Sequence, residues 1–123
     1  MSRILVIDDN EAIRHVLATF LPSFGHTVTV AESGEAGLDA ANGALTDFIL
    51  LDVEMPRMSG IAVCETLKRD PLRSHIPVLM MTGNLARDVV HRARRAGAIA
   101  VLGKPFTWDQ LIDHFSRHLP AVV

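Results

Sequence analysis

The feature that most constrains the fold of this chain is a regular alternation of short apolar runs with longer stretches of helical periodicity. Apolar runs begin near residues 3, 27, 47, 77 and 98, and in the segment after each one apolar residues recur every three or four positions. A short apolar run indicates a buried strand, and the longer periodicity indicates an amphipathic helix. Five such units in succession predict an α/β domain with a parallel sheet covered by helices on both faces.

Local signals predict where several helices begin and end. Asn10 and Ser33 suit the N-cap positions of the first and second helices, and Thr107 suits that of the last one. Gln110 would complete a capping box with Thr107, and Gly97 suits the left-handed position after the fourth helix. The aromatic residues that we expect in the core are Phe20, Trp108 and Phe115.

Composition and charge exclude several classes of protein. The 123 residues include 12 basic and 14 acidic ones, and this net charge of −2 gives no general reason to expect a nucleic-acid or membrane surface. No apolar run reaches the roughly 18 residues that cross a bilayer, and acidic residues follow the start too soon for a signal peptide. A single cysteine, Cys64, excludes a disulfide scaffold. We therefore expect a cytoplasmic protein with one domain over residues 1–123, standing alone rather than excised from a longer chain.

Polar side chains follow four of the five predicted strands. The first strand ends in Asp8 and Asp9, the third in Asp52 and the fourth in Thr82, while the fifth leads into Lys104. In an open parallel sheet, ligands bind at the carboxyl ends of the strands, so these side chains should share one edge. Each residue alone is explained as well by a turn, a cap or a surface lysine. Their combination at the equivalent end of four strands favours a functional site.

The chemistry of this predicted site is that of phosphoryl transfer. Three neighbouring carboxylates resist ionisation unless a cation balances them, and ligands that are all oxygen suit Mg²⁺. A lysine and a hydroxyl beside them can bind anionic oxygens, so the pocket would position a phosphoryl group and stabilise its charge. A carboxylate next to the metal can itself act as the nucleophile and form an aspartyl phosphate.

At these residues the chain resembles the receiver domain of response regulators, over essentially its whole length. The matching stretches are 4–10, 49–60, 77–82, 97–98 and 102–106. The resemblance implies a flavodoxin-like, doubly wound, five-stranded sheet of order 2-1-3-4-5. It also implies a signalling switch of a two-component phosphorelay that receives a phosphoryl group from a phosphohistidine on a sensor histidine kinase or a histidine phosphotransfer protein. Catalysis would be limited to its own phosphorylation and dephosphorylation, so the chain is not expected to be an enzyme for outside substrates.

The resemblance assigns the acidic residues to two roles. Asp52 would be the phosphoacceptor. Asp8, Asp9 and Asp52 would hold the Mg²⁺ ion, with Asp9 and Asp52 as direct ligands and Asp8 acting through water. The backbone carbonyl of Glu54 would complete the protein ligands.

The remaining site residues follow from the same resemblance, with one departure. Lys104 would contact the phosphoryl oxygens, Thr82 would move to meet them on activation, and the peptide bond between Lys104 and Pro105 would be cis. The family usually carries Tyr or Phe three residues before the lysine, whereas Val101 stands here. We therefore expect activation to be transmitted by the loop after Thr82 and the following helix, without a rotating aromatic ring.

Glu54 and Asn84 each stand two residues past a site residue, at places that flank the route of the attacking water in receivers. An anionic Glu54 could repel the incoming phosphodonor, orient a water or simply be a solvated loop carboxylate, and these readings stay open. An alternative function is a Mg²⁺-dependent phosphohydrolase with an aspartyl-phosphate intermediate and Glu54 as its general acid. That alternative leaves the acid pair of the first strand unexplained.

The predicted fourth helix is strongly basic, which fits either a solvated helix face or a surface for an acidic partner or a second copy of the chain. Its basic residues are Arg87, His91, Arg92, Arg94 and Arg95. No helix-turn-helix pattern accompanies it, so direct nucleic-acid binding is not expected. The downstream target is expected to be a protein that the residues do not specify, and a homodimer is left open.

Overall fold

The computed structural model describes residues 2–43 and 45–119, and their five parallel strands form one sheet of order β2-β1-β3-β4-β5. The strands are β1 (Ser2–Ile7), β2 (His26–Ala31), β3 (Phe48–Asp52), β4 (Val78–Thr82) and β5 (Ala100–Gly103). The helices are α1 (Glu11–Phe20), the short 3-10 helix η1 (Leu21–Phe24), α2 (Gly34–Gly43), α3 (Gly60–Arg69), α4 (Arg87–Arg95) and α5 (Trp108–His118). The predicted fold class and strand order are confirmed.

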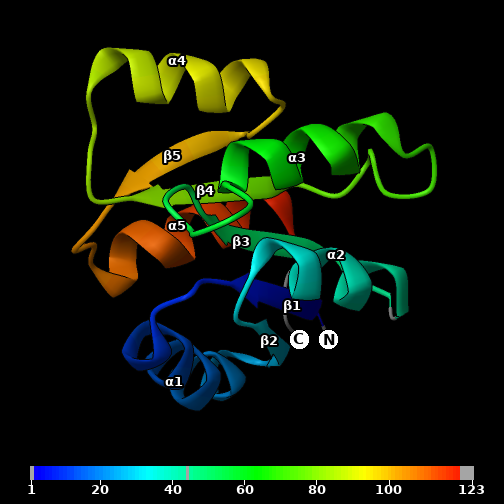
Figure 1. Cartoon of the computed structure of the whole chain (residues 1–123). Coiled ribbons are helices and arrows are strands. Elements are labelled where there is room, and N and C mark those ends of the chain that lie inside the picture. The colour runs from blue at the N-terminus through cyan, green and yellow to red at the C-terminus, as the bar shows by residue number, and fades with distance from the viewer. Residues whose placement is uncertain (1, 44, 120–123) are drawn as a thin grey trace.

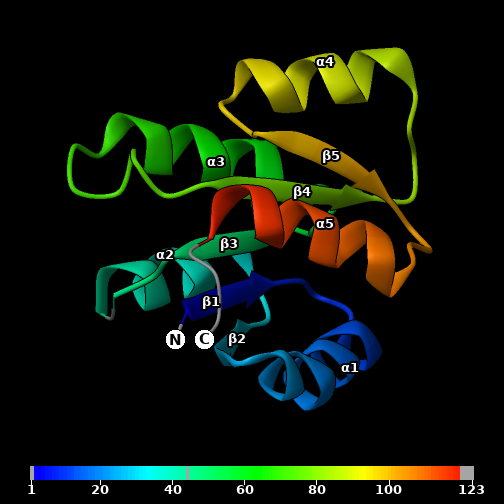
Figure 2. The same cartoon turned by 180° about the vertical axis from the view of Figure 1, so that it is seen from behind.

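Helices cover both faces of the sheet, with α1 and α5 on one side and α2, α3 and α4 on the other (Figures 1 and 2). The two sides share the central strands because successive side chains of a strand point in opposite directions. Ile4 and Val6 of β1 pack in the core under α1 and α5, whereas Leu5 and Ile7 pack in the core on the other side. β3 is buried along its whole length, as its unbroken apolar run predicts.

The predicted helix ends agree with the structure. The Asn10 side chain accepts a hydrogen bond from the Ile13 N–H, and both halves of the capping box at Thr107 are present. Gly97 has a φ of +112° after α4, and the next N–H, of Ala98, donates to the Ala93 carbonyl. Ala98 therefore belongs to the end of the helix, and β5 begins at residue 100 rather than 98. Among the described residues, no helix has the length and hydropathy that spanning a membrane requires.

The prediction that Phe20 and Trp108 lie in the core is wrong. Their exposed fractions are 50% and 37%, and their rings contact each other with centroids 5.7 Å apart. Leu17 of α1, Leu21 of η1 and Leu111 of α5 are the buried residues here, so the two rings are left at the outer rim. Phe115 is buried, as predicted.

His26, at the start of β2, gives the fold a predicted pH dependence. Its ring packs against Phe115 with centroids 5.2 Å apart, and its Nδ1 has no hydrogen-bond partner among the described residues. Burial lowers the pKa of His26 from its ordinary value of 6.5. As the pH falls through about 6.5, His26 therefore binds a proton in the unfolded chain but not yet in the folded protein, and the free energy of unfolding decreases.

We expect the free energy of unfolding in urea to fall less between pH 7.5 and pH 5.5 in His26→Gln than in the wild type. His75→Gln, which changes an exposed histidine, is the control and should follow the wild type. Equal losses of stability in all three proteins would show that His26 does not titrate as its burial implies.

Candidate functional site

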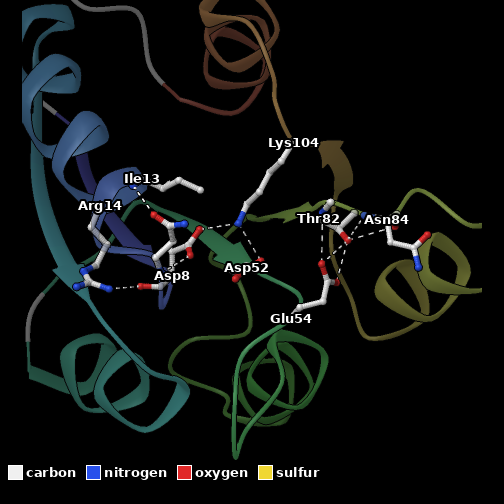
Figure 3. Close-up of polar contacts among 10 residues, drawn as sticks. Asp8, Ile13, Arg14, Asp52, Glu54, Thr82, Asn84 and Lys104 are labelled. Atoms are coloured by element: carbon white, nitrogen blue, oxygen red, sulfur yellow. Dashed lines mark hydrogen bonds and ion pairs between the residues drawn. The ribbon is translucent and has the colours of Figure 1, made fainter.

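The polar residues predicted at the strand ends meet at the carboxyl edge of the sheet (Figure 3). Asp8 follows β1, and Asp52 ends the adjacent strand β3. Lys104 follows β5 and reaches across to both carboxylates, with its Nζ 2.9 Å from Asp8 Oδ2 and 3.1 Å from Asp52 Oδ1. The pocket is thus built from side chains 96 and 52 residues apart in the sequence.

Three carboxylates form the acidic part of the pocket. Asp8, Asp9 and Asp52 each offer one oxygen, and these atoms lie within 4.8 Å of one another. Asp8 and Asp52 are buried, whereas Asp9 is exposed. Burial, followed by the charge of Asp8, raises the pKa of Asp52 to about 7, against the opposing effect of Lys104. The oxygen donors of this cluster suit a Mg²⁺ ion. The positive charge of the ion would offset the repulsion among the carboxylates and favour their ionised forms.

Lys104 stays cationic in this pocket. Burial by itself would lower the pKa of the ammonium group, but its hydrogen bond to Asp8 and the charges of Asp52 and Asp8 outweigh burial and raise the pKa above its ordinary value. The ammonium therefore supplies a fixed positive charge beside the two buried carboxylates. The peptide bond between Lys104 and Pro105 is cis, as the resemblance implies.

Hydrogen bonds position Asp8, and close packing shapes the loop after Asp52. The Asn10 N–H donates to Asp8 Oδ1 at 2.9 Å, and Arg14 Nη1 donates to the Asp8 carbonyl oxygen at 2.7 Å. On the other strand, a Cβ added to Gly60 would collide with the carbonyl oxygen of Asp52, so the loop after β3 needs a glycine there. The Arg14 contact was not predicted, because Asp8 follows a strand and Arg14 lies in the next helix, so no single periodicity spans the pair.

The Glu54 side chain does not extend freely into solvent. The Thr82 Oγ1 lies 2.8 Å from each carboxylate oxygen of Glu54, and the Gly83 N–H donates to Glu54 Oε1 at 3.3 Å. The Asn84 N–H donates to Thr82 Oγ1 at 3.0 Å, while the Asn84 side chain accepts from the Ala86 N–H. The structure therefore links Glu54 and Asn84 through the Thr82 hydroxyl, which the sequence analysis did not foresee. The Glu54 backbone carbonyl as a metal ligand stays a prediction.

Val101 of β5 and the basic residues of α4 differ in exposure. Val101 is half-buried and packs on the same side of the sheet as Val89 and the buried Ala93 of α4. The five basic side chains of α4 are exposed, and the helix buries little besides Ala93. Its basic face is therefore open to solvent. This exposure agrees both with a solvated helix face and with a surface for an acidic partner or a second copy of the chain.

The sheet order and the pocket define a flavodoxin-like α/β protein whose ligand site combines clustered aspartates with a lysine. The family model of the response regulator receiver domain matches residues 4–116. The chain therefore belongs to the receiver domain family of two-component response regulators.

Known relatives differ in length around this shared domain. The chemotaxis protein CheY of Pseudomonas aeruginosa is 34% identical over 116 residues, which cover 94% of both chains. The response regulator PleD of Caulobacter vibrioides is 41% identical over 104 residues, which cover 85% of this chain and 23% of PleD.

Solved structures share the fold along almost the whole chain. The chemotaxis protein CheY4 of Vibrio cholerae superimposes with a TM-score of 0.91 at 29% identity, covering 97% of this chain and 99% of CheY4. TrrA of Thermotoga maritima, solved in complex with Mg²⁺-BeF, superimposes with a TM-score of 0.85 at 29% identity, covering 97% of this chain and all of TrrA.

Proposed function

We propose that this chain is a phosphoacceptor switch in which Asp52 receives a phosphoryl group from a phosphohistidine on a sensor histidine kinase or a histidine phosphotransfer protein. The observation that carries the proposal is the convergence of Asp8, Asp52 and Lys104 within hydrogen-bond distance in one pocket. The complex of the similar protein TrrA with Mg²⁺-BeF supports it, because beryllofluoride on a carboxylate mimics a phosphoryl group.

The pocket residues have distinct roles in the proposed reaction. A carboxylate oxygen of Asp52 attacks the phosphorus, the bond from phosphorus to the histidine nitrogen breaks, and that nitrogen keeps the electron pair and takes up a proton. Lys104 turns its ammonium toward the phosphoryl oxygens and stabilises their charge. Asp8, Asp9 and Asp52 would hold Mg²⁺, which would offset the negative charge around the phosphorus when bound. In the separate dephosphorylation step, water attacks the phosphorus, the bond from phosphorus to the Asp52 oxygen breaks, and inorganic phosphate leaves while Asp52 regains its carboxylate.

The proposed output begins at Thr82. When its hydroxyl moves to the phosphoryl group, the Asn84 N–H loses the acceptor that it has in the resting state, so the loop before α4 rearranges. Val101 offers no aromatic ring to carry the change, which leaves this loop and α4 as the route to a downstream protein. The chain would act catalytically only on itself.

The proposal is tested by incubation with Mg²⁺ and acetyl phosphate, followed by intact mass measurement. The wild type should gain a single phosphoryl adduct, whereas Asp52→Ala, or the wild type in EDTA, should gain none. An unmodified wild type, or an adduct that persists on Asp52→Ala, would overturn the proposal. Repeated turnover of p-nitrophenyl phosphate would instead support the phosphohydrolase alternative.

A further inference from the structure

We propose that the side chain of Glu54 is a positioning residue that holds the Thr82 hydroxyl in its resting place and competes for it with the phosphoryl group. The inference rests on the proposed function, because it takes a phosphoryl group on Asp52 as the competing acceptor. It gives Glu54 a role that depends on its contact with Thr82, rather than on its charge alone.

The geometry around Thr82 shows a strong resting interaction. A threonine hydroxyl has one hydrogen to donate, and both Glu54 carboxylate oxygens lie 2.8 Å from Thr82 Oγ1. The other acceptor in reach, the Asn84 carbonyl oxygen, is more distant at 3.1 Å and is uncharged. Because hydrogen bonds to an ionised acceptor are roughly twice as strong as neutral ones, the hydroxyl favours Glu54.

The position of Glu54 makes the interaction a bridge between two strand ends. Glu54 lies in the loop after β3, and Thr82 ends β4, which pairs with β3 in parallel. In Figure 3 the Glu54–Thr82 pair lies on the opposite side of Asp52 from Asp8. The Gly83 N–H donates to the same carboxylate, so the last residue of β4 and the first residue of the loop that leads to α4 both contact Glu54.

The consequence is a threshold for activation. The Thr82 hydroxyl can donate to a phosphoryl oxygen on Asp52 only when it no longer donates to Glu54. The free energy gained from the new hydrogen bond is therefore partly offset by the loss of the one to Glu54. A glutamine at position 54 would keep a neutral acceptor of the same length and shift the balance toward the phosphoryl group. Simple repulsion between Glu54 and an anion would also disappear in that variant, so the test has to separate the two causes.

A double-mutant cycle separates them. Beryllofluoride binding is measured by calorimetry in saturating Mg²⁺ for the wild type, Glu54→Gln, Thr82→Val and the double variant, and Mg²⁺ binding alone is measured in parallel. We expect Glu54→Gln to bind beryllofluoride about three- to tenfold more tightly, since the competing bond falls to about half its strength. This gain should vanish in the Thr82→Val background and persist in Thr82→Ser, which keeps the hydroxyl.

Glu11→Gln is the matched charge control, because Glu11 is an exposed acid in the first turn of α1 near Asp8 and Asp9. An equal gain in Glu11→Gln, an unchanged affinity in Glu54→Gln, or a gain that survives Thr82→Val would overturn the inference while leaving the proposed function intact. A wild type that binds no beryllofluoride and forms no phosphoryl adduct would overturn both.

Discussion

Replacing Lys104 with methionine is expected to destabilise the Mg²⁺-free protein at neutral pH by about 3–5 kcal/mol, because removing one partner of a buried ion pair leaves uncompensated charge. The ammonium binds Asp8 and Asp52, whose side chains are 0% and 4% exposed. Since domains are stable by only about 5–15 kcal/mol, this loss is a large part of the total. The same variant should lose most of its labelling by acetyl phosphate, because the phosphoryl oxygens lose their cationic partner.

The measurement is urea unfolding of Lys104→Met in EDTA at pH 7.5, repeated with Mg²⁺. Added Mg²⁺ should restore part of the stability, because it would balance the charges that the lysine balanced. Arg94→Met removes one positive charge from the exposed face of α4 and should change stability by less than about 0.5 kcal/mol. If Lys104→Met lost no more stability than Arg94→Met, the buried pairing would not have the structural role described.

Replacing Asp52 with asparagine should have the opposite effect on stability. Burial and the charge of Asp8 raise the pKa of Asp52 from 3.8 to about 7. Between these values the folded protein binds a proton that the unfolded chain has released, so wild-type stability falls as the pH rises toward 7. Asparagine has no proton to lose, and we expect Asp52→Asn to be more stable than the wild type in EDTA at pH 8 by on the order of 1–3 kcal/mol.

The comparison at two pH values identifies the cause. At pH 4, where the folded carboxyl is protonated, the advantage of Asp52→Asn in urea unfolding should shrink toward zero. Mg²⁺ should stabilise the wild type more than the variant, because the variant lacks one anionic ligand. An advantage that is the same at both pH values would point to packing or hydrogen bonding at position 52, rather than to the cost of ionising Asp52.

The local part of the fold was predictable because strands and helices follow periodicities of adjacent residues. The unbroken apolar run of β3 predicted a strand covered on both sides, and Asn10 and Thr107 predicted two helix starts. Periodicity did not distinguish the outward aromatic positions from the inward ones, so Phe20 and Trp108 were misplaced. Leu17, Leu21 and Leu111 are the buried residues there, and which apolar residues of a helix are buried depends on the elements packed against it.

The sequence by itself determined the succession of five strand–helix units and placed Asp8, Asp52, Thr82 and Lys104 at equivalent strand ends. The tertiary structure alone decided which of these side chains touch. It joined Lys104 to carboxylates 96 and 52 residues away, and it joined Glu54 to Thr82 across 28 residues. The physical reason is that strand ends follow from local periodicity, whereas hydrogen bonds between separate strands depend on the order of strands in the sheet and on side-chain packing between them.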